Sequence, residues 1–300
     1  MVEWASCPSC GKEDLNAGPL YAHSRVKVAH RRDATNLPCI YIQEIAIYEV
    51  VFRETSHGNA EDLGGALRYV RGFMAALGVS ICCYEYSGYG HSRGQGPSET
   101  HVYADIEAAF NQLIHRHHVP QEQIVVVGRS LGTGPSTFLA AKYPGIKALV
   151  LISALASVYR VSIPVQIQSL PGDRFCSIDR MLKVKAPLLL LHGTNDKLTS
   201  PEHARALAEK AGAEYSVCCF LSGATHRTIL SSDWRPIIND EIKQFLINTH
   251  PPRSSSTNPK EDSRRPRTTY MRFKEKPTFS RASKNAAPAL TRLLSGMAIA

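Results

Sequence analysis

The chain has 300 residues, 43% of them apolar, which is enough to bury the core of one large domain with tails. Its formal net charge of +9 is concentrated in residues 251–300, which hold 11 Lys and Arg against 3 Asp and Glu, while residues 1–250 hold 24 against 23. The nearly neutral body lacks the broad basic face that nucleic-acid binding needs, and no stretch reaches the ~18 consecutive apolar residues of a membrane span.

Short apolar runs alternate along the chain with segments of helical periodicity. The expected strands are residues 38–42, 48–52, 79–84, 123–128, 148–152, 187–191 and 215–221. The expected helices are residues 62–77, a segment over residues 102–113, residues 136–143, a helix opened by Ser200 and Pro201, and residues 234–246. This alternation predicts the α/β class, with a mostly parallel central sheet and helices on both faces.

Two places in this series are irregular. Arg53-Glu54-Thr55 interrupts the second early strand, which therefore either stops early or changes register there. The long connection over residues 153–186 has room for only a short helix or two, and we expect it to form a short cap over the domain.

The composition divides the chain into three expected parts. Residues 1–36 form an N-terminal arm, residues 37–250 the folded domain, and residues 251–300 a disordered basic tail. Such a tail could make peripheral contact with anionic lipid headgroups, or it could be a solvated extension with no dedicated partner.

The cysteines favour a reduced, cytoplasmic setting. Cys82-Cys83 and Cys218-Cys219 are adjacent pairs in strand-like runs, so their side chains should point to opposite faces as buried thiols, not as a disulfide framework.

The N-terminus has no apolar run typical of a secretory signal. Cys7 and Cys10 could be S-acylated, unmodified, or half of a zinc site, although no second C-x-x-C follows; we expect no metal and no cofactor.

One segment suggests chemistry directly. Residues 125–135 read VVVGRSLGTGP, a buried strand that turns sharply into a helix at Ser130. Gly128 and Gly132 stand two residues before and after this serine, where only small residues let strand and helix pass closely. This G-x-S-x-G pattern marks a nucleophile elbow, although the same pentapeptide also occurs as an ordinary turn.

A base and an acid stand at the matching places. Asp196 follows the strand at residues 187–191, and His226 follows the strand at residues 215–221. The order Ser, Asp, His along the chain is that of the α/β-hydrolases, in which His226 would take the serine proton and Asp196 would orient the imidazole. Alternatively, His226 is a surface-loop histidine with no catalytic role, and Asp196 is a turn aspartate before a helix.

An oxyanion site completes the expected machinery. The backbone N–H of Asn59, in a turn after an early strand, and the N–H of Leu131, directly after Ser130, are the expected donors. His57 is interpreted as a structural residue of that turn and not as a second base.

Several longer blocks carry a family resemblance. They are SHGNAEDLG (56–64), YEYSGYGHS (84–92), YADIEAAF (103–110), GRSLGTGPS (128–136), DRFCSIDRMLKVKAPLLLLHGTND (173–196) and GATH (223–226). Together they resemble the α/β-hydrolase-domain proteins that remove palmitate from cysteines. The resemblance implies an α/β-hydrolase fold and a serine thioesterase acting on S-acylated proteins, with Ser130, Asp196 and His226 as the triad. That family anchors to membranes through an N-terminal cluster of S-acylated cysteines, for which this chain offers only Cys7 and Cys10.

Three interpretations of function follow. The first is a thioesterase acting on S-acylated proteins, and the second is an esterase, monoacylglycerol lipase or serine peptidase of the same fold, since a triad alone does not separate substrates. The third, a non-catalytic scaffold, has no need of a complete set of serine, acid, base and oxyanion turn. Five apolar residues of the cap could line an acyl pocket or form the packing face of the cap; they are Leu155, Val158, Val161, Ile163 and Val165.

Overall fold

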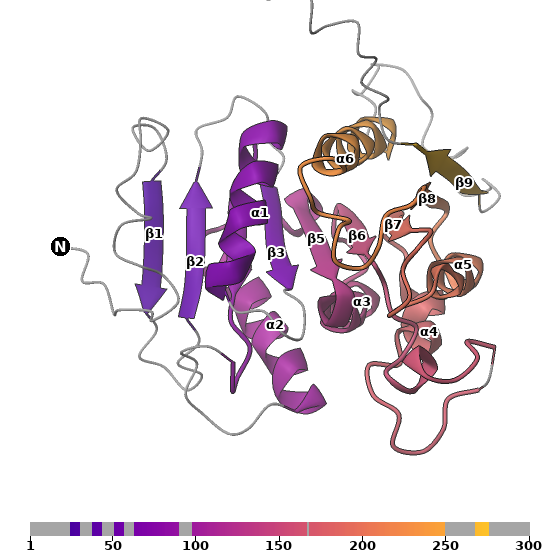
Figure 1. Ribbon diagram of the computed structural model, residues 1–300. Coiled ribbons are helices and arrows are strands. Elements are labelled where there is room, and N and C mark those ends of the chain that lie inside the picture. Colours follow the sequence, from indigo (N-terminus) through magenta and orange to yellow (C-terminus); the bar gives the residue numbers. More distant parts are fainter. Residues whose placement is uncertain are drawn as a thin grey trace, which may run out of the picture.

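The computed structural model describes residues 25–30, 38–43, 51–56, 63–89, 98–166, 168–249 and 268–275, over which strands and helices alternate (Figure 1). The strands are Arg25–His30 (β1), Pro38–Gln43 (β2), Val51–Ser56 (β3), Ile81–Tyr84 (β4), Ile124–Arg129 (β5), Ala148–Ile152 (β6), Leu188–Gly193 (β7), Tyr215–Leu221 (β8) and Thr268–Lys274 (β9). The α-helices are Leu63–Leu77 (α1), Glu99–His115 (α2), Thr133–Lys142 (α3), Ser177–Arg180 (α4), Pro201–Lys210 (α5) and Arg235–Thr249 (α6). Single 3₁₀ turns are Gln121–Gln123 (η3), Ser130–Gly132 (η4), Tyr159–Val161 (η5) and Met181–Lys183 (η6).

The described strands form one sheet in the order β1-β2-β4-β3-β5-β6-β7-β8-β9. β1 and β2 pair antiparallel, as do β2 and β4, whereas every pairing from β4 through β3 to β9 is parallel. The central strands are buried along their length because helices cover both faces, which explains their continuous apolar runs. The expected α/β class and mostly parallel sheet are confirmed.

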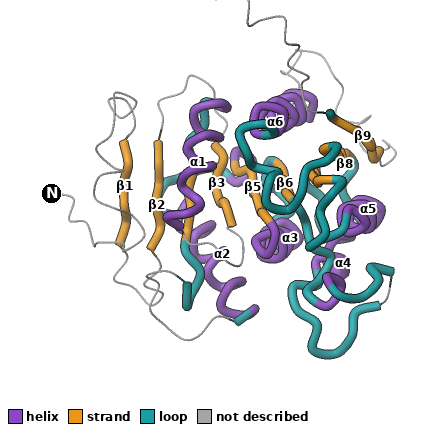
Figure 2. Tube along the Cα trace, viewed as in Figure 1, coloured by secondary structure: helices purple, strands orange, loops and turns teal. Residues whose placement is uncertain are grey.

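Helices lie on both faces of the sheet (Figure 2), and the core has two layers, one on each face. Helices α2, α3 and α5 cover one face with residues such as Ile106 and Leu139, while α1 and α6 cover the other with residues such as Val70 and Ile238. Each such aliphatic side chain stabilises the fold by about 1.5–3 kcal/mol when fully buried. The cysteine pairs follow the strand alternation: Cys82 and Cys218 lie in the first layer, and Cys83 and Cys219 in the second, all as free thiols.

Three elements differ from the expectation. Residues 25–30 form β1 although an arm was expected over residues 1–36, and residues 268–274 form β9 although a disordered tail was expected over residues 251–300. Both are edge strands whose partners, β2 and β8, hold them by backbone pairing that no local pattern reveals. β3 begins at Val51, later than expected. Its pairing with β5 shifts register between Phe52 and Thr55. Of the two alternatives for the interrupted strand, the structure therefore has the change of register.

Within the described residues of the 153–186 connection, the structure has η5, α4 and η6. α5 begins where expected, with Ser200 at the N-cap position and Pro201 in the first turn, although the Ser200 side chain makes no capping hydrogen bond. Within the described residues, none of the helices combines the length and the apolar character needed to cross a membrane.

Candidate active site

Ser130 stands on a strained turn between β5 and α3. Its φ of 52° lies in the left-handed region, which a non-glycine residue adopts only when the surroundings require it. The close approach of strand and helix explains the glycine two residues earlier. A Cβ at Gly128 would lie 2.6 Å from the Gly132 carbonyl oxygen and 2.6 Å from Ser136 Oγ. The pattern therefore forms the predicted elbow, which presents the Ser130 hydroxyl at the carboxyl end of the sheet.

His226 lies beside this hydroxyl. Its Nε2 is 2.8 Å from Ser130 Oγ, and its Nδ1 is 2.8 Å from Asp196 Oδ2. Because an ionised carboxylate only accepts, Nδ1–H donates to Asp196, which leaves Nε2 to accept the hydrogen bond from Ser130. The structure thus brings together the three residues that the sequence separates by up to 96 positions.

The loops that carry acid and base are built against each other. Asn195 donates its backbone N–H to Ala224 O at 2.9 Å, and Gly223 donates its own to Thr194 Oγ1 at 2.8 Å. Gly193 ends β7 where a Cβ would come within 2.3 Å of Ala224 O, so only glycine permits this contact. The loops after β7 and β8 therefore place Asp196 and His226 as one unit.

Asp196 is buried and accepts hydrogen bonds on both oxygens. Oδ1 accepts from the backbone N–H groups of Leu198 at 3.0 Å and Thr199 at 2.9 Å, while Oδ2 accepts from Thr199 Oγ1 at 3.1 Å and from His226. Burial by itself would raise the pKa of Asp196, but the hydrogen bond and charge of His226, with the Thr199 N–H, outweigh it, so the pKa lies below its usual value. The acid is therefore held ionised.

Two further histidines are buried near the acid. His192 Nε2 donates to Thr199 O at 2.8 Å, and His203 Nδ1 accepts from the Ala156 N–H at 3.0 Å. Burial lowers the pKa of His192, and burial followed by the charge of His192 lowers the pKa of His203 to about 4. Both imidazoles are therefore neutral near pH 7 and serve as hydrogen-bonding groups.

The oxyanion site is described only in part. The Leu131 N–H follows Ser130 in η4, at the start of the segment that continues into α3, where backbone N–H groups favour an anion. Asn59 and His57 lie outside the described residues, and so do Cys7 and Cys10. The roles expected for these four residues therefore stay predictions.

Thr199 is the site residue that sequence reasoning missed. It contacts both oxygens of Asp196 through its N–H and hydroxyl, and its Oγ1 also lies 3.2 Å from His226 Nδ1. The available signal was its position three residues after the acid, the spacing at which a Thr hydroxyl and N–H fold back onto an aspartate.

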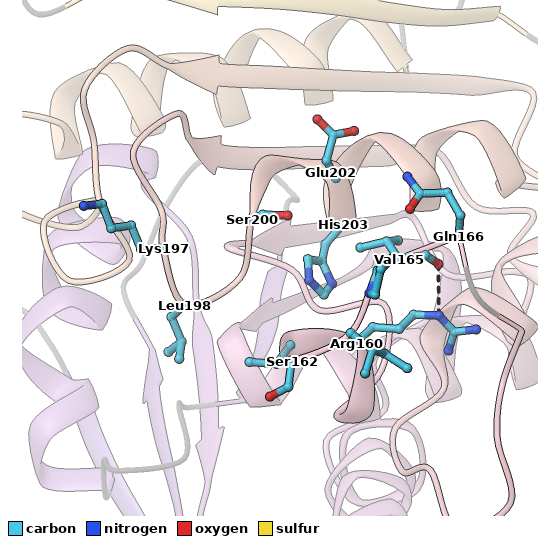
Figure 3. Close-up of a pocket in the computed structure, with 12 residues that line it drawn as sticks. Arg160, Ser162, Val165, Gln166, Lys197, Leu198, Ser200, Glu202 and His203 are labelled. Atoms are coloured by element: carbon cyan, nitrogen blue, oxygen red, sulfur yellow. Dashed lines mark hydrogen bonds between the residues drawn. The ribbon is translucent and has the colours of Figure 1, made fainter.

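A cavity of about 270 Å³ lies beside the acid, between cap residues 160–166 and residues 197–203 (Figure 3). Arg160 supports the cap side of this cavity because its buried guanidinium donates to Val165 O at 3.1 Å and to Asp173 Oδ2 at 3.3 Å. Ser130 is not among the residues that line this cavity, which adjoins the loop that carries Asp196 through Lys197 and Leu198.

The cap residues expected at an acyl pocket divide between two environments. Val161, Ile163 and Val165 line this cavity. Leu155 is instead buried in the core layer with α3 and α5, while Val158 is exposed at the surface of the cap. Three residues of this apolar set therefore line a cavity of the cap and one packs in the core, and their lining of an acyl pocket stays a prediction.

The fold and the Ser130 elbow define an α/β hydrolase. The family model described as alpha/beta hydrolase fold matches residues 57–174, and the one described as TAP-like protein matches residues 161–258. Human alpha/beta hydrolase domain-containing protein 17B is 34% identical over 215 residues, which cover 71% of this chain and 73% of that protein. Protein 17C of Xenopus tropicalis is 40% identical over 205 residues, covering 68% and 63%. The chain belongs to this family of alpha/beta hydrolase domain-containing proteins, and the resemblance read from the sequence is confirmed.

Solved structures share the fold at low sequence identity. Alpha/beta hydrolase domain-containing protein 10 from mouse has a TM-score of 0.57 at 18% identity, covering 75% of this chain and 100% of its own. The Pyrococcus furiosus esterase Pf2001 has a TM-score of 0.60 at 16% identity, covering 75% and 93%. At such identities the likeness concerns the fold alone.

Proposed function

We propose that this hydrolase is a serine thioesterase that removes fatty acyl groups, palmitate foremost, from S-acylated cysteines of proteins. The observation that carries the proposal is the chain of two 2.8 Å contacts from Ser130 through His226 to Asp196, on an elbow that holds Ser130 at a φ of 52°. One further feature supports the substrate, namely the sequence blocks shared with depalmitoylating proteins.

Acylation begins when Ser130 Oγ attacks the thioester carbonyl carbon and its proton passes to His226 Nε2. The ionised Asp196 holds Nδ1–H and stabilises the imidazolium. The developing oxyanion accepts a hydrogen bond from the Leu131 N–H and, as we expect, from the Asn59 N–H. Collapse breaks the carbon–sulfur bond, the cysteine sulfur takes the proton from His226, and the acyl group stays on Ser130.

Deacylation repeats these steps with water. His226 takes a proton from the water that attacks the acyl-serine, and collapse returns the proton to Ser130 Oγ as the carboxylic acid leaves. The net change consumes one thioester and one water and yields one fatty acid and one thiol. No redox step arises, so the reaction needs only the groups named above.

Fatty acyl chains anchor proteins to membranes, so the proposed activity would take place at membrane surfaces. We propose that basic residues of the segment over residues 251–300 make a peripheral contact with anionic lipid on the cytosolic face. Arg272 and Lys274 contribute little because both pair with the buried Glu241. Binding to vesicles containing phosphatidylserine should weaken when residues 276–300 are deleted, a truncation that retains β9, and should weaken further when the basic residues over 253–267 are also changed to alanine. Binding undiminished by both changes would exclude this contact.

The proposed activity is tested by release of palmitate from an S-palmitoylated peptide by the full chain. Ser130→Ala should lower the rate by about 10⁴-fold or more, because no other group replaces the nucleophile. Ser232→Ala removes an exposed serine and should leave the rate unchanged. If the thioester stays intact while short oxygen esters are cleaved in a Ser130-dependent manner, the protein is an esterase or lipase and the thioesterase proposal is wrong.

A further inference from the structure

The hydroxyl of Thr199 lies where the acid and the base meet. Thr199 is 2% exposed, in the loop between Asp196 and α5. Its Oγ1 is 3.1 Å from Asp196 Oδ2 and 3.2 Å from His226 Nδ1, and those two atoms are 2.8 Å from each other. The three atoms therefore form a closed triangle around the proton that His226 donates to Asp196.

A hydroxyl has one proton, so its direction can be assigned. The ionised Asp196 Oδ2 at 3.1 Å is a stronger and closer acceptor than the third neighbour of Oγ1, the Ser153 carbonyl oxygen at 3.5 Å. Thr199 therefore donates to Asp196 and turns its lone pairs toward His226 Nδ1–H. The imidazole proton then has Asp196 as its main acceptor and Thr199 as a second one.

The backbone of Thr199 fixes the hydroxyl in this place. Its N–H donates to Asp196 Oδ1 at 2.9 Å, and its carbonyl oxygen accepts from His192 Nε2 at 2.8 Å. His192 belongs to β7, is fully buried, and is neutral near pH 7 because burial lowers its pKa. The sheet thus positions Thr199 through His192, and Thr199 contacts both oxygens of the acid.

We propose that Thr199 is a positioning residue for the His226–Asp196 pair, whose hydroxyl fixes the carboxylate and the imidazole in the orientation that the proton transfer from Ser130 requires. The inference rests on the proposed serine chemistry but not on the identity of the acyl substrate. Thr199 touches neither Ser130 nor the reacting carbonyl, so its effect should fall on the chemical step and not on substrate binding.

Kinetics of an isosteric variant provide the main test. Thr199→Val keeps the β-branched shape and removes only the hydroxyl, whereas Thr199→Ser keeps the hydroxyl. We expect Thr199→Val to lower kcat for a p-nitrophenyl ester, and the rate at which a fluorophosphonate labels Ser130, by about tenfold, with KM within twofold, since one hydrogen bond to a charged group is lost. Thr199→Ser should stay within about twofold of the wild type.

Controls separate this role from packing. Thr137→Val removes another fully buried hydroxyl, one that donates to Thr133 O in α3, and should leave kcat unchanged. If Thr199→Val does not fold, Thr199→Ser and Thr199→Ala differ by the hydroxyl alone, and the serine variant must react about tenfold faster. Equal rates for these two, or a Thr199→Val rate equal to that of the wild type, would overturn the inference.

A spectroscopic readout is independent of activity. The proton that His226 Nδ1 shares with Asp196 should give a low-field ¹H NMR resonance, which moves upfield or broadens in Thr199→Val and is kept in Thr199→Ser. An unchanged resonance in Thr199→Val contradicts the inference even in the absence of turnover. By contrast, a wild-type protein that fluorophosphonate does not label would refute the serine mechanism itself.

Discussion

At the scale of single residues, the site depends on a few positions where the backbone is strained or packs unusually closely. Ser130 adopts a left-handed conformation at a cost of about 1–3 kcal/mol, and the packing of β5 against α3 maintains it. Gly128 makes that packing possible because its missing Cβ leaves room for the Gly132 carbonyl. The position of the Ser130 hydroxyl therefore depends on the absence of a Cβ at Gly128.

Gly128→Ala should damage the site more than the fold. The added Cβ meets Gly132 O and Ser136 Oγ at 2.6 Å, so β5 and α3 must separate, at a cost of about 1–3 kcal/mol in the free energy of unfolding. A displacement of Ser130 by about 1 Å should slow fluorophosphonate labelling by about 10²-fold. Gly145→Ala is the matched control, because its Cβ meets only the flexible end of the Gln121 side chain. Labelling of Gly128→Ala at the rate of Gly145→Ala would show that the close approach is not required.

At the scale of elements, the first helix after the acid also holds the cap. His203 lies on α5, and its Nδ1 accepts the N–H of Ala156 at the start of the cap. This bond requires an unprotonated Nδ1, and the burial of His203 together with the charge of His192 lowers its pKa to about 4. Attachment of the cap to α5 is therefore coupled to the protonation of this imidazole.

The free energy of unfolding should decrease as the pH is lowered, because of His203. An unfolded histidine has a pKa near 6.5, so between about pH 6.5 and pH 4 the unfolded chain binds a proton that the folded chain does not, and unfolding becomes more favourable as pH falls. The largest loss from a shift of this size is about 3 kcal/mol. Measurements of the free energy of unfolding in urea from pH 7.5 to pH 4 should show a shallower fall for His203→Gln than for the wild type. His115→Gln, at an exposed position, should follow the wild type; parallel curves for all three proteins would contradict the assignment.

At the scale of the whole molecule, the C-terminal strand is held to the sheet by a buried charge. Glu241 of α6 is 2% exposed and pairs with Lys274 Nζ at 2.7 Å and with Arg272 Nη1 at 3.5 Å, both on β9. β9 also stacks on β8 through Phe220 and Phe273, whose ring centroids are 5.3 Å apart. Two basic residues of a segment that is strongly basic by composition therefore neutralise an acid inside the fold.

Lys274→Ala should destabilise β9 because it leaves the buried Glu241 carboxylate short of a partner. Since Lys274 is 40% exposed, we expect a loss of about 1–2 kcal/mol in the free energy of unfolding, less than for a fully buried pair. Hydrogen exchange of the β9 amides should be faster, and adding Glu241→Gln in the same chain should recover part of the loss. Lys243→Ala, an exposed lysine on α6, is the control. A Lys274→Ala protein as stable as this control would mean that the ion pair does not hold β9.

The sequence by itself determined the features that depend on local pattern. Apolar runs and helical spacing located the central strands and most helices, and the glycines around Ser130 predicted the elbow, because these signals arise from residues close together in the chain. The positions of Asp196 and His226 followed from a general rule, since parallel strands bring their carboxyl ends to one edge. Strand alternation placed the paired cysteines on opposite faces.

Only the tertiary structure decided which groups that are distant in the sequence form strand pairs and hydrogen bonds with one another. β1 and β9 became strands because β2 and β8 offered free edges, and the polar run in β3 became a change of register against β5. Thr199 joined the site because its hydroxyl meets a base 27 residues further along the chain. Buried charges and unpaired backbone groups must find partners wherever the fold brings them, and that requirement leaves no periodic trace in the sequence.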